Sequence, residues 1–303
     1  MKKIVIAATI ALLSLSSVRA CEICGCGLGN YYIGLMPQFN HTFFGVRYQY
    51  RNFKTVVAND PSQFSHDYYK TVELWGGWNI GKKWQVIALL PYNFVHQVSD
   101  DGVSNNQGMG DISVMANYKL FEKNSTAKNY QKVSHQLWVG AGIKLPTGKF
   151  NVDASDPALV ALANTQTGSG SIDMTLNSMY NLKINDLGFN TNASYTFNTS
   201  NSDHYKFGNK FSVGTIAYYL LKSGAVGINP NIGLQLETIT SNTLNKKEVE
   251  QTGGHTLTSS AGVELSIKKF TFGTNFQLPV SQDLSAGQTK LRKKCLVHIS
   301  VSL

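Results

Sequence analysis

The sequence predicts an all-β protein, a transmembrane antiparallel up-and-down β-barrel of about 12 strands. Three observations lead to this fold class: alternating apolar and polar residues recur from about Gln38 to Leu303, each stretch is about a dozen residues long, and short turns alternate with longer loops between them. A strand that crosses a bilayer at a tilt needs roughly 9–11 residues, whereas strands of soluble proteins average about 5–6. Such a barrel places its apolar face in lipid and its polar face in a wet interior.

The first 20 residues predict a secretory signal peptide. Lys2 and Lys3 form its charged start, residues 4–15 its short apolar core, and Val18-Arg19-Ala20 a small-residue cleavage site. We therefore divide the chain into a signal at 1–20, a Cys-rich segment at 21–37 that lies in the periplasm or plugs the barrel, and the barrel itself at 38–303.

Twelve segments carry the strand pattern, and they follow one another in this order: 41–53, 68–80, 84–98, 110–121, 133–145, 171–184, 187–199, 207–221, 225–240, 256–268, 270–280 and 291–303. Short turns such as Gly81-Lys82-Lys83 and Asn185-Asp186 alternate with longer loops such as 54–67 and 146–170. Short turns at one rim and long loops at the other are typical of bacterial outer-membrane barrels, whose short turns and termini face the periplasm.

The two faces of each predicted strand differ in composition. In the last strand, Val297, Ile299 and Val301 alternate with His298 and Ser300. The polar faces are mostly Asn, Ser, Thr, Gln and Gly, whereas a soluble β-sandwich or barrel would need Lys and Glu there. Aromatic residues near strand ends predict girdles at the lipid boundary: Trp78, Trp84, Tyr92, Tyr118, Tyr180 and Tyr219.

Charge and motif content exclude two classes of function. The net charge is +9, but the basic residues are scattered over turns and strand ends, and export argues against a nucleic-acid partner. The sequence contains neither G-x-S-x-G nor H-E-x-x-H, and His298 and Ser300 share a face that points inward. We do not expect an enzyme.

Eight charged residues fall on inner faces, because an ionisable group at membrane depth must face water or another charge. They could form a selectivity lining, or a ladder of ion pairs that stiffens the wall. The two aspartates among them stand at strand starts beside glycines and could instead cap turns. The candidates are Arg47, Arg51, Glu73, Asp111, Lys144, Asp173, Glu237 and Glu264.

The Cys-rich segment is the dense cluster of potential metal ligands in the sequence. Cys21, Cys24 and Cys26 could bind Cu(I) or Zn²⁺. Two alternatives stay open: Cys21 as the acylated residue of a lipoprotein, and a disulfide formed in the oxidising periplasm.

Three short motifs resemble a known family. Residues 108–112 read Gly-Met-Gly-Asp-Ile, residues 143–149 read Ile-Lys-Leu-Pro-Thr-Gly-Lys, and residues 168–173 read Gly-Ser-Gly-Ser-Ile-Asp. Their order resembles the outer-membrane transporter family related to the meta pathway of phenol degradation, and the Cys-rich head resembles a Bacteroidetes-type subgroup of it. The resemblance implies a channel in the outer membrane of a Gram-negative bacterium, for small hydrophobic or aromatic solutes.

Our prediction is therefore a monomeric outer-membrane channel or transporter that contacts lipid outside and a small solute inside. Two alternatives are a copper-binding barrel that uses the Cys-rich head, and a structural barrel without an open pore.

Overall fold

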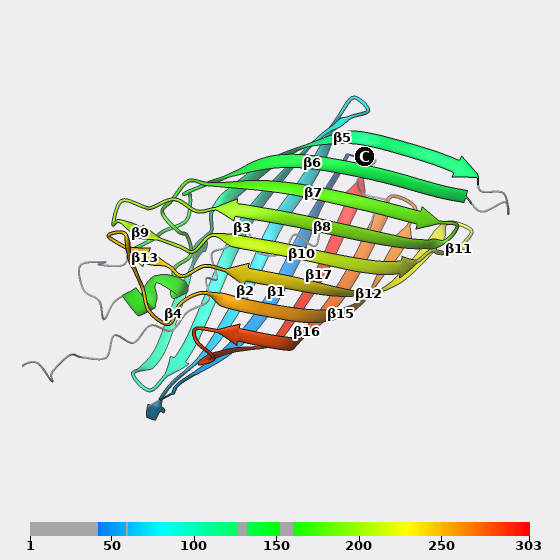
Figure 1. The fold of residues 1–303 in the computed structure, drawn as a ribbon. Coiled ribbons are helices and arrows are strands. Elements are labelled where there is room, and N and C mark those ends of the chain that lie inside the picture. The colour runs from blue at the N-terminus through cyan, green and yellow to red at the C-terminus, as the bar shows by residue number, and fades with distance from the viewer. Residues whose placement is uncertain (1–41, 59, 127–131, 152–159) are drawn as a thin grey trace, which may run out of the picture.

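The protein is a closed antiparallel β-barrel in a computed structural model that describes residues 42–58, 60–126, 132–151 and 160–303 (Figure 1). Its strands follow one another around the ring in chain order, and the ring closes where the first strand pairs with the last. Within these ranges no helix is long and apolar enough to cross a membrane.

Twelve strands make up the ring: β1 (Phe43–Val57), β2 (Asp60–Ile80), β3 (Trp84–Ser99), β5 (Ile112–Thr126), β6 (Lys132–Leu145), β7 (Asp173–Ile184), β8 (Leu187–Phe197), β10 (Lys210–Tyr219), β12 (Val226–Ile239), β15 (Gly254–Ile267), β16 (Phe270–Leu284) and β17 (Thr289–Ser302). Two short strands continue the wall, with β4 (Gly102–Met109) paired to β3 and β11 (Leu221–Ser223) paired to β12. The predicted fold class is confirmed.

Tight turns connect the strands at one end of the barrel, the short-turn end. Asn185 and Lys268 adopt φ values of 53° and 54° there, and Gly224 adopts 58°. Positive φ matches the backbone of a two-residue hairpin to the right-handed twist of its strands. These turns fall where the sequence places them.

The strands reach further than predicted at the opposite, long-loop end. Residues 54–67, expected as a loop, continue the β1–β2 ladder as far as the pair Val57 and Asp60, with a register shift after Val56. Residues 99–109 form the β3–β4 hairpin, and residues 281–284 extend β16. Polar hairpins that stand clear of the lipid need no apolar face, so the hydrophobic pattern does not reveal them.

The connections that follow β6, β8 and β12 pack together at the long-loop end. They contain the 3-10 helix η2 (Val160–Thr165) and a small sheet of β9 (Tyr205–Lys206), β13 (Thr243–Leu244) and β14 (Lys247–Glu248). Tyr205, Phe207 and Ala163 are buried between them, with Phe150 packed alongside. Figure 1 shows this group at the left, beyond the ends of the main strands.

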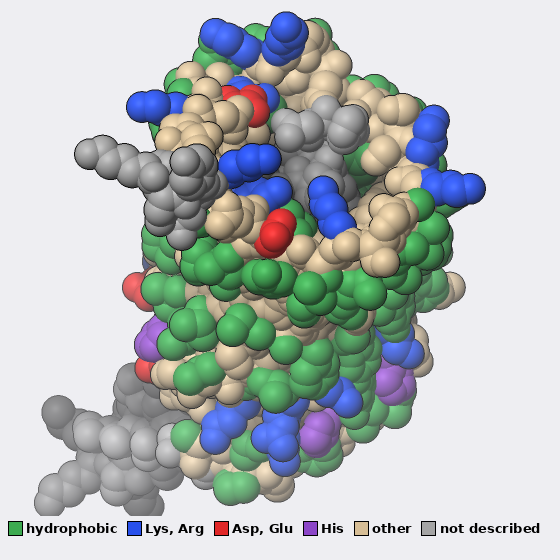
Figure 2. All heavy atoms as spheres, turned by 90° about the vertical axis from the view of Figure 1, so that its right-hand side faces the viewer, with side chains coloured by type: hydrophobic (Ala, Val, Ile, Leu, Met, Phe, Trp, Pro, Cys, Tyr) green, Lys and Arg blue, Asp and Glu red, His purple; other side chains and the backbone are tan. Residues whose placement is uncertain are grey.

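The outer wall is apolar and the inner wall polar, because successive side chains point to opposite faces. On β1, the exposed Phe44 and Val46 alternate with the buried Phe43 and Arg47. Figure 2, a view toward the short-turn end, shows a belt of hydrophobic side chains around the barrel and basic side chains gathered at the rim. Trp78, Trp84 and Tyr219 of the predicted girdle are exposed on the outer wall.

Candidate functional site

The inner wall is lined largely by amide and hydroxyl side chains. Asn177 donates to Asn117 over 3.0 Å, and Asn190 donates to Asn181 over 2.6 Å. Thr175 and Thr196 share a bond of 3.0 Å between neighbouring strands. Cross-strand polar pairs of this kind satisfy buried donors and acceptors inside the barrel. The interior is therefore a polar surface, as expected for a membrane barrel with a wet lumen.

The structure places Arg47, Arg51 and Glu73 on the inner faces of β1 and β2. Arg47 and Glu73 stand opposite each other in the ladder and form a buried ion pair. The guanidinium carbon of Arg51 lies 5.5 Å from the centre of the Tyr69 ring, within the range of a cation–π contact.

Glu237 and Glu264 lie on the inner faces of β12 and β15. Glu237 forms an ion pair of 2.7 Å with Lys210 of β10. Glu264 has an exposed fraction of 0% and faces the imidazole Nε2 of His298 at 3.5 Å. The structure thus gives these acidic candidates basic neighbours, and their role in selectivity stays a prediction.

The remaining three candidates meet at one buried junction, which we call the Lys144 junction and define by Lys144, Asp111, Asp173 and Ser169. The Lys144 ammonium lies 3.2 Å from Asp111 Oδ2 and also forms an ion pair with Asp173. Lys144 donates in addition to the Ser169 hydroxyl. Each of the three sequence motifs contributes to this junction, so motifs far apart in the chain form a single structural unit.

The two aspartates of the junction also cap loops. Asp111 accepts hydrogen bonds from the backbone N–H groups of Gly148, at 3.0 Å, and Ser169, at 2.9 Å. Asp173 accepts one from the N–H of Thr199 at 2.9 Å. Ion pairing and capping, set apart as alternatives by sequence reasoning, occur here at the same carboxylates.

The junction holds the connection between β6 and β7 against the inner wall. Asn93, on the inner face of β3, donates to the carbonyl of Thr167 over 2.9 Å, and Asn106 of β4 donates to that of Thr165 over 3.1 Å. Gly148 and Gly168 approach so closely that a Cβ on Gly148 would lie 2.6 Å from the Gly168 Cα. The segment from Thr165 to Ser171 therefore lines the lumen at the long-loop end.

Sequence reasoning missed an apolar cluster on the inner wall. Phe43, Trp75, Ile87, Leu89, Trp138 and Met179 are all buried there. Phe43 and Trp75 meet edge to face, with ring centres 4.7 Å apart. The alternation could have indicated these inward side chains. Trp75 stands two residues from the inward Glu73, and Trp138 two residues from the inward Gln136, so each tryptophan shares the face of its neighbour. The lumen thus combines a polar wall with an aromatic and aliphatic patch.

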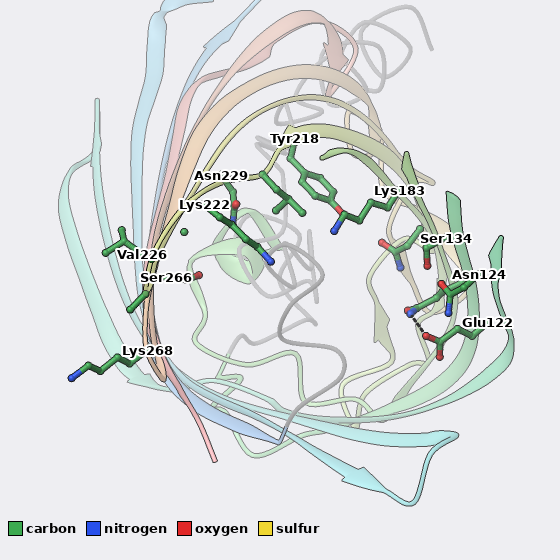
Figure 3. Close-up of a pocket in the computed structure, with 16 residues that line it drawn as sticks. Glu122, Asn124, Ser134, Lys183, Tyr218, Lys222, Val226, Asn229, Ser266 and Lys268 are labelled. Carbon is green, nitrogen blue, oxygen red and sulfur yellow. Dashed lines mark hydrogen bonds between the residues drawn. The ribbon is translucent and has the colours of Figure 1, made fainter. Parts of the chain in front are cut away.

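A cavity of about 630 Å³ opens at the short-turn end. Its lining includes Tyr218, Leu220, Asn181 and two lysines, Lys183 and Lys222. Figure 3 shows both lysines directed into the lumen from different parts of the wall, while Lys268 points away from it. Glu122 also lines this cavity. Its carboxylate accepts hydrogen bonds from Lys119 at 2.7 Å and from Gln136 at 3.0 Å.

The predicted metal ligands Cys21, Cys24 and Cys26 lie outside the described residues. Among the residues that are described, no group of three or more His, Cys, Asp or Glu side chains is arranged to hold a metal ion. Cys295 is a free thiol on the outward face of β17.

Comparison with a solved outer membrane channel supports the fold. The COG4313 outer membrane channel from Pseudomonas putida F1 superposes with a TM-score of 0.66 at 12% identity, over 91% of this chain and 100% of that one. The β domain of the Bordetella autotransporter BrkA gives a TM-score of 0.49 at 11% identity, over 87% of this chain and 100% of that one. The NanC porin gives a TM-score of 0.43 at 12% identity, over 86% of this chain and 100% of that one.

Comparison of sequences identifies the family. No curated protein sequence matches this chain. A family model described as "Putative MetA-pathway of phenol degradation" matches residues 49–287, which is most of the barrel and includes the whole Lys144 junction. The chain has the fold of an outer-membrane β-barrel and belongs to this family.

Proposed function

We propose that the protein is a channel that passes small solutes across the outer membrane, with its short-turn end facing the periplasm. The observation that carries the proposal is the contrast between the two faces of one closed barrel. The outer wall exposes Ile232, Leu234 and Phe276, while the inner wall at the same strands carries Asn231 and Asn275. A polar interior within an apolar wall is the arrangement of a solute channel.

Two observations favour a solute with an apolar part, which is the more specific part of the proposal. The cluster around Trp75 and Trp138 places apolar side chains on the inner side of the wall. The family description refers to phenol degradation, and the P. putida relative is named as an outer membrane channel. Aromatic surfaces inside a polar lumen bind the ring of such a solute, and the amides around them bind its polar group.

One chain is enough to close the wall. Each ring strand pairs with a neighbour on both sides, and the ring closes because β1 pairs with both β2 and β17. We therefore propose a monomer. The segment 21–37 is proposed as a periplasmic extension or a plug, and a deletion of these residues tests the plug: conductance should rise if they occupy the lumen and stay the same if they do not.

Reconstitution of the purified protein into planar bilayers tests the channel. We expect stepwise conductance, and uptake of small solutes by liposomes that contain the protein. A matched control is Cys295→Ser, which changes one outward side chain and should leave conductance unchanged. If the folded protein gave neither conductance nor uptake, with or without residues 21–37, the channel proposal would be wrong.

A further inference from the structure

A group of basic side chains lies on the outer wall toward the long-loop end, and we call it the basic patch. Its members come from three neighbouring strands, β2, β1 and β17 (Figure 1). Each of them adjoins a residue that is buried on the inner face, so its own side chain points outward. The patch consists of Lys54, Lys70, Lys290, Arg292 and Lys293.

The pairing of the strands brings these cations close together. Lys54 of β1 stands directly opposite Lys290 of β17. Arg292 is the extra residue of a bulge in β17, and both Arg292 and Lys293 are exposed. Side chains at opposed positions on one face have Cβ atoms about 4.5–5.5 Å apart. Like charges at this separation repel each other, so the patch favours an anion placed between them.

The basic patch has no acidic partner within the described part of the chain. β1 and β17 contain no acidic residue, and Asp67 and Glu73 of β2 are buried on the inner face. Asp60, at the hairpin end of β2, is bound by neighbouring side chains. Asp283 of β16 stands beside Lys290 without forming an ion pair with it. In the described ranges, no side chain of the patch takes part in an ion pair or a hydrogen bond.

The basic patch is confined to one side of the barrel. Among the other ring strands as described, the alternation places a Lys or Arg on the outward face at Lys123 of β5 alone. Lys123 pairs with His135 at the short-turn end, far from the patch. Cations that only held the barrel at its depth in the bilayer would be spread around the ring. Five cations on three adjacent strands form a localised site instead.

Aromatic and apolar side chains border the patch on its short-turn side. The Lys293 ammonium lies 5.7 Å from the centre of the Tyr50 ring. Further along the same outward faces, β1 exposes Val46 and Phe44, and β2 exposes Val72 and Leu74. Tyrosine is typical of the boundary between head groups and hydrocarbon in a membrane. The patch therefore lies at the level of lipid head groups, with a surface for acyl chains directly beside it.

We propose that the basic patch binds the phosphate groups of an outer-leaflet glycolipid, the chemistry of lipopolysaccharide, whose acyl chains lie against the apolar wall beside it. The proposal goes beyond the passage of solutes and rests only on the proposed orientation, with the long loops outside the cell. Arg292 can bind a phosphate through two N–H groups, and the lysines act around it as point charges. Each cation near the membrane surface adds to the attraction of an anionic head group.

Native mass spectrometry of the detergent-solubilised protein measures lipid binding, with lipid A that carries two phosphates as the probe. The patch variant combines three substitutions: Lys70→Gln, Arg292→Gln and Lys293→Gln. The matched control removes three exposed lysines at the short-turn end: Lys82→Gln, Lys123→Gln and Lys269→Gln. We expect lipid A to bind the wild type and the control alike, and to bind the patch variant roughly 10- to 100-fold more weakly.

Two further comparisons separate charge from folding. Lipid A without phosphate should not distinguish the three proteins, and Lys70→Arg with Lys293→Arg should retain the binding of phosphorylated lipid A. The shift in gel mobility on heating shows whether each barrel is folded. If the triple variant did not fold, Arg292→Gln against Lys123→Gln gives the same comparison, with an expected loss of about 5-fold.

Equal binding of lipid A by the folded patch variant and the control would overturn the proposal. Phosphatidylglycerol that bound the patch as tightly as lipid A would overturn the assignment to an outer-leaflet glycolipid. All these proteins should conduct alike in planar bilayers, because the patch faces away from the lumen. Binding that depends on the patch in a protein without conductance would support the patch and overturn the channel alone.

Discussion

Replacement of Lys144 by methionine tests whether the Lys144 junction stabilises the barrel. Methionine keeps most of the length of the side chain but removes its charge and its hydrogen-bond donors. The Lys144 side chain is buried, and so are its partners Asp111 and Asp173, with exposed fractions of 7% and 0%. The substitution therefore leaves two carboxylates without their shared cation inside the wall.

The magnitude follows from this burial. Removal of one partner from a buried ion pair costs about 3–5 kcal/mol, because the remaining charge stays desolvated. Backbone N–H groups still reach both carboxylates, three bonds in all from Gly148, Ser169 and Thr199. These bonds offset part of the loss, so we expect the free energy of unfolding to fall by about 3 kcal/mol, the lower end of that range.

Urea unfolding in lipid vesicles, followed by tryptophan fluorescence, measures this free energy. Lys149→Met is the matched control, since Lys149 is an exposed lysine of the same connection. Addition of Asp173→Asn to Lys144→Met should recover part of the loss, because one of the two unpaired charges is removed. A loss below about 1 kcal/mol, or one equal to that of the control, would show that the backbone bonds alone satisfy the carboxylates and would refute the reasoning.

Three further substitutions probe the wall by the same measurement. Arg47→Met leaves Glu73 buried without its partner and should lower the free energy of unfolding by about 3–5 kcal/mol, with partial recovery when Glu73→Gln is added. Ile232→Arg places a charge on the outer wall near the middle of β12, where Ile232 is 66% exposed, and should cost about 2–4 kcal/mol; a negligible cost would mean that this position does not face lipid. Gly45→Val should cost about 1–3 kcal/mol, because even its Cβ would overlap the carbonyl of the adjacent strand and lie 2.8 Å from Trp75 Nε1, and unchanged stability and fluorescence would contradict this packing.

The twelve ring strands could be predicted because a period of two is a local property of the sequence. The short turns were equally visible, since residues such as Asn185 and Gly224 supply the positive φ that tight hairpins need. The ends of the strands at the long-loop end could not be located. Backbone pairing continues there through polar residues such as Ser65 and Ser99, whose side chains need no particular face outside the lipid.

The inward direction of the candidate charges followed from the same alternation, but their partners did not. Arg47 meets Glu73 through the register of two neighbouring strands, and Lys144 meets Asp111 and Asp173 only after three strands are in place. Sequence separation carries no information about such pairs. The three motifs thus indicated a family without revealing that they form one junction.

Lys294 of β17, a lysine with an exposed fraction of 6%, shows where the alternation indicated an inward charge that the sequence analysis did not include. It stands two residues from Leu296, on the inward side of β17. A register shift opposite Asn52 and Phe53 breaks the alternation just before it, so its side could be assigned only by counting back from the chain end. Two of the charged groups that act on it, Lys210 and Glu237, lie on β10 and β12, which no local pattern connects to β17.

The pairing of Phe43 with Ser302 has a consequence for how this protein is made. The strand that closes the barrel, β17, is the last of the ring strands to be synthesised. The barrel therefore cannot close until this strand has also been exported. Until β17 meets β1, the hydrogen-bonding groups of two edges stay open, and the hydrocarbon core of a bilayer offers them no partners. The finished wall therefore depends on contacts of the largest sequence separation, which form slowly. A chain truncated before Thr289 should accumulate as an unsealed, aggregation-prone species in the periplasm and not as a smaller barrel.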